Sequence, residues 1–260
     1  MSESESSATE KANPSKEGDI DSTSYPSKDA ARTTVWDRLQ EEKWAAFPFP
    51  PHGRIPNFKA AKKAAERLLS LPQLADIRVI KVNPDAPQRP LRELALRAGI
   101  KLLVPTPRLR DDFMLFDPED IPPESIRQAS AMKHFAKWSV PVKVNALPPV
   151  DLVVAGSVAV TVTGKRCGKG HGYSDLEYAI LRELGHPPCP VATTVHDRQL
   201  VGDFPIDGFD LPLSIIATPT QVLLPEAPPP PPDGIRWDTL TPEDLEAMPV
   251  LARLKAFKQV

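Results

Sequence analysis

The middle of the chain alternates between short apolar runs and stretches in which apolar residues recur every three or four positions. The apolar runs are rich in β-branched residues and end at turn residues, so they indicate strands. We expect strands at residues 76–82, 100–106, 150–160, 189–196 and 213–224, the last as one strand or two short ones. The helical spacing predicts helices at residues 36–46, 57–72, 90–99 and 175–185, with Asn57 as the N-cap of the second. This alternation indicates an α/β domain with a mainly parallel sheet and helices on both faces.

The run VDLVVAGSVAV, residues 150–160, is apolar almost throughout. Such a run is typical of a strand that is buried on both faces of a parallel sheet, and we expect one continuous strand here. Ligands in folds of this kind bind outside the carboxyl ends of the strands. We therefore expect functional residues in the segments that follow the predicted strands.

Both ends of the chain depart from this alternation. Residues 1–30 are rich in Ser, Glu, Lys and Asp and hold almost nothing to bury, which predicts a disordered acidic tail. The α/β domain is then expected over residues 31–224. Residues 225–234 include five consecutive prolines, which favour a stiff linker. We interpret it as a spacer rather than as a ligand for SH3 or WW domains.

Residues 235–260 are predicted to form a C-terminal helical segment that packs on the core. Thr241 is the expected N-cap of a helix in this segment, with Pro242 at its first position. Pro249 lacks a backbone N–H and should divide the helix into two short pieces.

Composition and charge narrow the class of protein. The 260 residues carry 32 Lys and Arg against 34 Asp and Glu, a formal net charge of −2, so the chain lacks the basic field of a dedicated nucleic-acid binder. A nucleic-acid partner would have to bind at a local site, because the overall charge of the chain does not favour it. No apolar run approaches the roughly 18 residues that cross a bilayer, and two cysteines cannot make a disulfide framework. We expect a cytoplasmic protein without a membrane partner, and the sequence makes no prediction of oligomeric state.

The segment GKRCGKGHGYSDLEYAILRELG, residues 164–185, combines glycines with positive charge and then becomes helical. Glycines let backbone N–H groups approach a ligand closely. Ser174 and Glu177 have the spacing of a capping box, which predicts Ser174 as the N-cap of the helix. A helix N-terminus attracts anions, and Arg166 and Lys169 add charge beside it. The pattern favours a phosphate cradle, with a flexible, basic surface loop as the alternative.

Asp175 stands where the anion would dock and would repel it unless a divalent cation bridges the two. The position therefore predicts an Mg-nucleotide rather than free phosphate, although an acid in the first helical turn also suits the helix dipole. Neither the Walker pattern GxxxxGK[ST] nor the dinucleotide pattern GxGxxG occurs in the loop.

Three weaker alternatives are left open. The first is a zinc site made by Cys167, His171, His186 and Cys189, although their spacing is not that of a standard finger. The second is a nucleophilic Cys167 activated by the neighbouring bases. The third is an acid–base pair of His196 and Asp197, which follow a predicted strand.

The glycine loop also matches the pattern G-x-R-x-G-x-G-x-G-Y-x-D, in which Arg166, Tyr173 and Asp175 are the residues other than glycine. This pattern resembles the signature loop of 5-formyltetrahydrofolate cyclo-ligases, also called methenyltetrahydrofolate synthetases. The segments WDRLQ, FPFPPHGRIPNFKAA, LLVPTPRLR and GYSDLEYAI resemble the branch of methenyltetrahydrofolate synthetase domain-containing proteins. The resemblance runs from about residue 35 to about residue 257.

The resemblance implies a three-layer, Rossmann-like α/β fold of the cyclo-ligase and NagB/RpiA/CoA-transferase type. It also implies ATP- and Mg-dependent conversion of 5-formyltetrahydrofolate to 5,10-methenyltetrahydrofolate: ATP phosphorylates the formyl oxygen, N10 attacks the activated carbon, and phosphate leaves. Arg166 and Lys169 are then the expected catalytic residues and Asp175 the expected metal ligand. The expected nucleotide contacts are Gly164, Arg166, Gly168, Lys169, Gly170, His171, Gly172 and Tyr173.

The loop departs from the family pattern at three positions: Ser174 replaces a second aromatic residue, Leu176 an arginine and His171 one of two bases. The family's N-terminal phosphate-binding element, K-x-x-L-R, has no clear counterpart in VWDRLQEEKW, which offers only Arg38 and Lys43. These departures favour nucleotide binding over folate turnover. The alternative function is therefore a non-catalytic nucleotide-binding or RNA- or protein-interaction protein that retains the fold.

Overall fold

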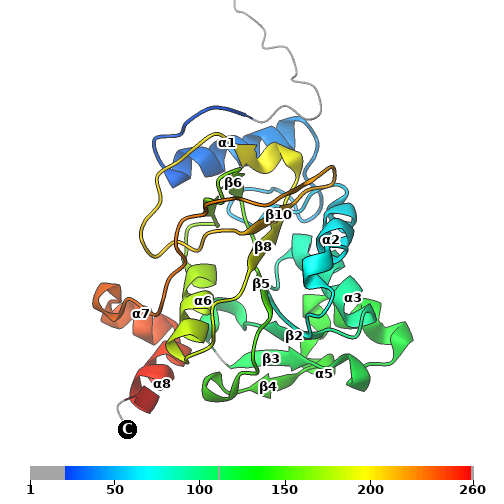
Figure 1. Ribbon diagram of the computed structural model, residues 1–260, viewed down its shortest axis with the longest axis vertical. Coiled ribbons are helices and arrows are strands. Elements are labelled where there is room, and N and C mark those ends of the chain that lie inside the picture. Colours follow the sequence, from blue (N-terminus) through cyan, green and yellow to red (C-terminus); the bar gives the residue numbers. More distant parts are fainter. Residues whose placement is uncertain (1–20, 111, 259–260) are drawn as a thin grey trace, which may run out of the picture.

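The computed structural model describes residues 21–110 and 112–258, and within them the centre of the molecule is an eight-stranded sheet (Figure 1). The strand order is β11-β10-β8-β5-β1-β2-β3-β4. The strands are β1 (Val79–Val82), β2 (Lys101–Val104), β3 (Phe113–Phe116), β4 (Val140–Val142), β5 (Leu152–Val154), β8 (Val191–Thr194), β10 (Ile215–Ala217) and β11 (Val222–Leu223). Strands β10 to β2 run parallel, whereas β3, β4 and β11 pair antiparallel. The mainly parallel sheet is confirmed; β3 and β4 escaped prediction because short runs carry too little periodicity.

A second sheet has the order β7-β6-β9 and consists of β6 (Ala159–Thr161), β7 (Arg166–Cys167) and β9 (Leu200–Val201). The prediction of one strand over residues 150–160 is wrong, because β5 and β6 belong to different sheets. The chain turns between them at Gly156, where an added Cβ would lie 3.0 Å from Ile55, and at Ser157, whose hydroxyl bonds to that of Thr193 at 2.8 Å. Apolar character predicted the burial of both strands but not the break between them.

Helices cover both faces of the large sheet. On one face, α2 (Ala61–Leu69) and α3 (Arg89–Arg97) pack against Leu102 and Leu152 of the strands. On the other, α6 (Tyr173–Glu183) and α8 (Pro249–Lys258) pack against Leu103 and Val153, as the alternation of side chains along a strand requires. Figure 1 shows the strands between these two helix layers. The three-layer α/β fold is therefore confirmed.

Shorter elements complete the chain. The other α-helices are α1 (Lys28–Glu41), α4 (Ile126–Ala129), α5 (Phe135–Trp138) and α7 (Pro242–Ala247). Short 3-10 turns lie at Pro72–Leu74, Ala86–Gln88, Pro107–Leu109, Pro118–Asp120, Pro123–Ser125, Met132–His134, Val144–Ala146, Asp197–Gln199 and Trp237–Thr239. The first five of these turns carry proline at their first or second position, where its fixed φ favours the start of a turn.

The N-terminal boundary differs from the prediction. Residues 1–20 of the predicted tail lie outside the described residues, but residues 21–30 pack on the domain. The backbone N–H of Tyr25 donates to Asp203 O at 2.8 Å, and Arg38 donates to the carboxylate of Asp21 at 2.5 Å. Helix α1 begins at Lys28, well before the predicted start, because the Ser27 hydroxyl accepts the N–H of Ala30 and caps it. Polar anchors of this kind escape a search for apolar residues.

Two other helix starts were also predicted wrongly. Helix α2 begins at Ala61, because the side chain of Asn57 donates to Phe47 O instead of capping the helix. Helix α6 begins at Tyr173 with Gly172 as its N-cap, at φ +68°. The expected capping box is absent: Ser174 accepts a hydrogen bond from Asn83, and Glu177 bonds to other residues described below.

The C-terminal helices follow the predicted signals. The Thr241 hydroxyl accepts the N–H of Asp244 at the start of α7, and α8 begins at Pro249. Val250, Leu251 and Leu254 of α8 are fully buried against the same core cluster as α6. Among the described helices, none is both long and apolar enough to cross a membrane.

Candidate functional site

Two cavities lie on either side of the glycine loop that joins β7 to α6. Cavity 1 has a volume of about 520 Å³ and is bounded by Asn83 at the carboxyl end of β1 and by Pro105 after β2. Cavity 2 has a volume of about 450 Å³ and is bounded by the first turns of α1. The residues that line both cavities are Arg166, Gly168, Gly172 and Asp175. The predicted loop therefore stands at the carboxyl ends of parallel strands, as folds of this class require.

Arg166 is buried inside this wall. Its guanidinium donates to Gly156 O at 2.8 Å, to Leu211 O at 3.3 Å and to the carboxylate of Asp175 at 2.6 Å. Burial alone would lower the pKa of Arg166, but Asp175 outweighs that effect and raises it. The side chain braces strand β7 against α6 as well as facing both cavities.

Asp175 uses one carboxylate oxygen for structure. Its Oδ1 accepts from Arg166 and from the N–H of Leu211 at 2.8 Å. Its Oδ2 has no hydrogen-bond partner among the described residues, and the side chain, 15% exposed, lines both cavities. A carboxylate oxygen of this kind is a ligand type that Mg²⁺ takes in proteins, and the role of Asp175 as a metal ligand stays a prediction.

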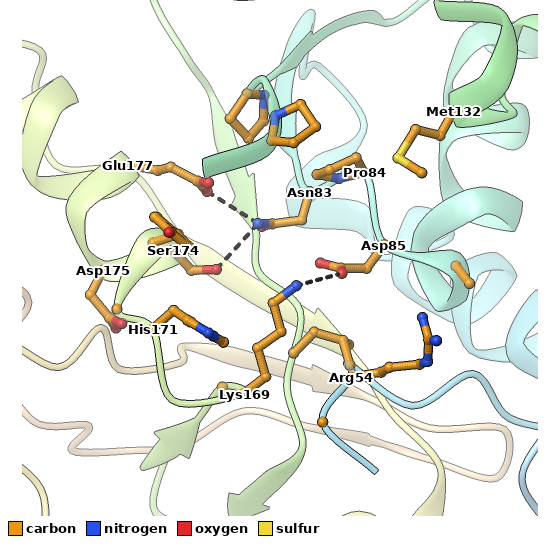
Figure 2. A pocket seen from close by; sticks show the side chains of 18 of the residues that line it. Arg54, Asn83, Pro84, Asp85, Met132, Lys169, His171, Ser174, Asp175 and Glu177 are labelled. Carbon is orange, nitrogen blue, oxygen red and sulfur yellow. Dashed lines mark hydrogen bonds and ion pairs between the residues drawn. The ribbon is translucent and has the colours of Figure 1, made fainter. Parts of the chain in front are cut away.

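Three other predicted residues lie in cavity 1 (Figure 2). Lys169 points across the cavity to Asp85, with Nζ 3.6 Å from Oδ1. The rings of His171 and Tyr173 stack with their centroids 5.7 Å apart. His171, which takes the place of one of the two bases of the family pattern, therefore stacks on Tyr173.

The predicted glycines separate into two groups. Gly168 and Gly172 line both cavities, and Gly170 lines cavity 2. Gly164, predicted as a nucleotide contact, lines neither cavity: it forms the turn between β6 and β7 at φ +88°. A Cβ there would lie 2.4 Å from Leu213 O, so close backbone packing and not a ligand explains this glycine.

Two basic residues of α1 near the glycine loop were not predicted from the sequence. Arg32 donates from Nε to Gly168 O at 2.6 Å and contacts Asp29, and Lys28 donates to Asp207 and Asp210, each at 2.7 Å. Lys28 and Arg32 have the spacing of the K-x-x-L-R element, with alanine in place of leucine. Their signal was a basic pair one helical turn apart, hidden because Lys28 was assigned to the tail and the first helix was expected only from residue 36.

A second missed feature is a polar network beneath cavity 1. Lys81 of β1 forms a buried ion pair with Glu177 of α6, and both contact Asn83. Asn83 and Glu177 line the cavity. The partners stand far apart in the sequence, and no local pattern marks such a contact.

The weaker alternatives gain no support from the geometry. No cluster of three or more metal-binding side chains occurs in the described part of the chain, which argues against zinc at the predicted residues. Cys167 is 2% exposed, and burial raises the pKa of its thiol, which disfavours the nucleophilic thiolate. The Asp197 carboxylate accepts from the hydroxyls of Thr218 and Thr220, and His196 packs on Trp44, outside both cavities.

The structure is therefore that of an α/β domain in which a glycine loop lies between two cavities, at the carboxyl end of a parallel sheet. The model of the 5-formyltetrahydrofolate cyclo-ligase family matches residues 15–219. The chain belongs to this family, which confirms the resemblance found in the sequence.

Individual relatives extend this assignment. The methenyltetrahydrofolate synthase domain-containing protein of Mus musculus is 44% identical over 238 residues, and that of Homo sapiens is 39% identical over 242 residues. These matches cover 88% and 90% of this chain but 63% and 62% of those proteins, so the chain spans about three fifths of their length. The 5-formyltetrahydrofolate cyclo-ligase of Escherichia coli K12 is 26% identical over 168 residues, which is 62% of this chain and 88% of that protein.

Solved structures give a more distant match. The 5,10-methenyltetrahydrofolate synthetase of Aquifex aeolicus aligns with a TM-score of 0.48 and 19% identity, over 76% of this chain and 93% of that chain.

Proposed function

We propose that the protein is an ATP- and Mg-dependent 5-formyltetrahydrofolate cyclo-ligase. One observation carries the proposal: a single loop, with Gly168 and Gly172 facing both sides, forms the wall between two cavities of different character. Transfer of a phosphoryl group from ATP to a bound formyl compound requires two adjoining sites with their reacting atoms close together. Membership of the cyclo-ligase family supports the same reaction.

Cavity 2 is the proposed site of the ATP phosphates. It combines Lys28 and Arg32 of α1 with the small residues Gly168 and Gly170, whose backbones a phosphate can approach closely. Burial alone would lower the pKa of Lys28, but its hydrogen bonds to aspartates raise it, so the ammonium group stays charged. The phosphates would compete with those aspartates for Lys28.

Asp175 is the proposed ligand of Mg²⁺ through Oδ2. The ion would neutralise developing charge on the transferring phosphoryl group. Arg166 would hold Asp175 in place through Oδ1, and Lys169 would be the cation that faces the formyl compound in cavity 1. In this arrangement Arg166 would not contact phosphate directly. It would act only by holding the loop and Asp175 in position.

Cavity 1 is the proposed site of the folate. Its volume lies in the usual range for small-molecule sites, and Ile55, Met132 and Tyr173 offer apolar and aromatic surface to a flat ring. Asn83 and Glu177 add polar groups at its floor. A cavity that combines apolar surface with polar and charged groups suits a pterin ring, whose faces are flat and whose edges carry hydrogen-bonding groups.

The direct test mixes the purified protein with Mg-ATP and 5-formyltetrahydrofolate, and follows the absorbance of the methenyl product and the release of phosphate. Turnover that requires both ATP and Mg²⁺ is expected. Lys169→Ala should lower the rate at least about tenfold, whereas Lys62→Ala on the exposed face of α2 should leave it unchanged. Absence of product with intact protein would contradict the proposal.

A second candidate is nucleotide binding without turnover. The observation that favours it is that the guanidinium of Arg166 already bonds to Gly156, Leu211 and Asp175. Binding of Mg-ATP without formation of the methenyl product would support this candidate over the first.

A further inference from the structure

A buried ion pair lies beside cavity 1, and one of its partners, Glu177, lines the cavity. Lys81 of β1 has no exposed surface, and the side chain of Glu177 is 4% exposed. The ammonium group of Lys81 donates to Glu177 Oε2 and, at 3.1 Å, to Asn83 Oδ1. The amide nitrogen of Asn83 in turn donates to Glu177 Oε2 at 3.1 Å and to the Ser174 hydroxyl at 3.2 Å. The network fixes the orientation of the Glu177 carboxylate.

Stability alone does not account for this pair. Burying two charges carries a large desolvation cost, and replacing a buried ion pair by apolar residues of similar size is often neutral or stabilising. The net effect of this environment raises the pKa of Glu177, mainly through burial, although the ion pair with Lys81 opposes that effect. The lysine in the middle of the central sheet is thus the group that favours the charged carboxylate at this point.

The carboxylate has one oxygen to offer. Both hydrogen bonds that Glu177 makes within the described residues are accepted by Oε2, which leaves Oε1 without a partner there. Glu177 is almost wholly buried and yet lines cavity 1. Figure 2 shows its carboxylate beside the Asn83 amide at the cavity wall. Oε1 is thus an acceptor held in a fixed position at the cavity.

The charge of the network determines which group this acceptor suits. Lys81 balances the charge of Glu177, so a cationic ligand group gains little there, and an anionic group would face carboxylate oxygens. A neutral N–H group can donate to Oε1 without adding a buried charge, and hydrogen bonds to ionised groups are stronger than neutral ones. The matching chemical class is a flat, neutral heterocycle with an amino or ring N–H donor on its edge.

We propose that Glu177 is the specificity-determining acceptor of cavity 1, that it binds the amino-bearing edge of a 2-amino-4-oxo heterocycle of the pterin type, and that Lys81 is its positioning residue. The inference rests on the proposed function, because it assigns the ring-binding end of the same cavity. Glu177 touches the ring, and Lys81 acts only through Glu177.

The test compares two fluorescent probes that differ at one position. Pterin carries an amino group where lumazine carries a carbonyl oxygen, so only pterin offers that donor to Glu177. The wild-type protein should bind pterin about tenfold more tightly than lumazine, as expected for a hydrogen bond to a charged acceptor. The double variant Lys81→Met/Glu177→Met removes both charges together and avoids an unpaired buried charge, and it should bind the two probes with affinities within about twofold of each other.

A matched control is the double variant Lys62→Met/Glu66→Met. It removes an ion pair of the same types from the exposed face of α2, and it should retain the preference for pterin. The single variant Glu177→Gln is a second test. It keeps the size of the side chain but removes its charge, and it should lose most of the preference for pterin. Thermal unfolding of each variant verifies that the comparison is made on folded protein.

The outcomes separate the two proposals. If the wild-type protein converts 5-formyltetrahydrofolate and the folded Lys81→Met/Glu177→Met variant still prefers pterin, the role of Glu177 is wrong and the proposed function stands. An equal loss of affinity for both probes would also overturn that role, because a purely structural change produces it. If the wild-type protein binds neither probe and makes no product, both proposals fail.

Discussion

Arg32 donates a hydrogen bond from Nε to the backbone oxygen of Gly168 at a distance of 2.6 Å. The contact joins the second turn of α1 to the loop that separates the two cavities. An N-terminal helix thereby becomes part of the wall of cavity 2, with Lys28 one helical turn before Arg32. This relationship makes α1 a component of the proposed phosphate site and not a peripheral element.

Replacing Arg32 by alanine should weaken the binding of Mg-ATP about tenfold, because it removes a charged donor and frees the loop backbone. Arg32→Lys should give a smaller loss, since lysine keeps the charge but not the planar geometry. Titration calorimetry with Mg-ATP measures both. Arg97→Ala, on the exposed end of α3, is the control; equal affinities of the Arg32→Ala and Arg97→Ala variants would contradict the role of α1.

Arg166→Met should destabilise the fold by about 3–5 kcal/mol, because it leaves Asp175 without its cationic partner and removes a donor from two backbone oxygens. The double variant Arg166→Met/Asp175→Leu should recover part of that loss, since no unpaired charge is then left. Urea unfolding gives the free energies. Arg97→Met breaks an exposed pair with Glu93 and should change stability by less than about 1 kcal/mol. A similar small loss for Arg166→Met would show that Arg166 is not a brace.

Two glycines of the loop region should respond differently to alanine. At Gly164 the new Cβ meets a backbone oxygen at 2.4 Å and φ is +88°, so strain and a clash combine. At Gly172 φ is +68° but nothing lies within 4 Å, so only the strain of about 1–2 kcal/mol applies. Thermal unfolding should show the larger loss for Gly164→Ala, and the reverse order would contradict the assignment of Gly164 to packing.

The contribution of the N-terminal segment to stability should depend on pH through Asp21. Burial alone would raise the pKa of Asp21, but hydrogen bonds from Thr23, Tyr25 and Arg38 outweigh it and hold the pKa well below its usual value of 3.8. A depressed pKa stabilises the folded state above the unfolded pKa, and the contribution is lost as the pH falls toward the folded value. Because the site is partly exposed, we expect this contribution to the free energy of unfolding to be about 1 kcal/mol or less.

Asp21→Asn should therefore lower stability by a constant amount between about pH 5 and 7, and the difference from wild type should shrink below about pH 4. Urea unfolding at several pH values measures the effect. Asp76→Asn, at an exposed position between α2 and β1, is the matched control and should show no such difference. A loss that is independent of pH down to pH 3 would show that the charge of Asp21 is not involved.

The C-terminal helix α8 should behave as part of the core. Leu254→Ala removes a fully buried side chain and should cost about 2–5 kcal/mol. Phe257→Ala on the same helix removes a side chain that is 55% exposed, and should cost far less. Chemical unfolding compares the two. Equal small losses would mean that the segment after residue 234 does not stabilise the domain.

Local patterns in the sequence predicted much of this structure. Apolar runs located the parallel strands, proline and threonine at residues 241–249 located the C-terminal helices, and clustered glycines located the wall between the cavities. Each of these signals depends on neighbouring residues alone. Burial, turns and caps of this kind are encoded within a few positions of the chain.

Contacts between distant residues could not be predicted in this way. Lys81 and Glu177 are separated by 96 positions, and Arg32 and Gly168 by 136. The capping-box spacing of Ser174 and Glu177 was misleading, because both side chains bond across to the end of β1. Tertiary partners determined the roles of these residues, and a single sequence holds no local trace of such partners.

The wall shared by the two cavities has an energetic consequence. Any ligand that prefers one arrangement of the loop changes the probability of that arrangement for the opposite side as well. By thermodynamic linkage, an occupant of cavity 1 that tightens binding in cavity 2 must itself be tightened by the same factor. Whenever either occupant shifts the five-residue stretch from Gly168 to Gly172, the binding of one occupant therefore strengthens or weakens the binding of the other.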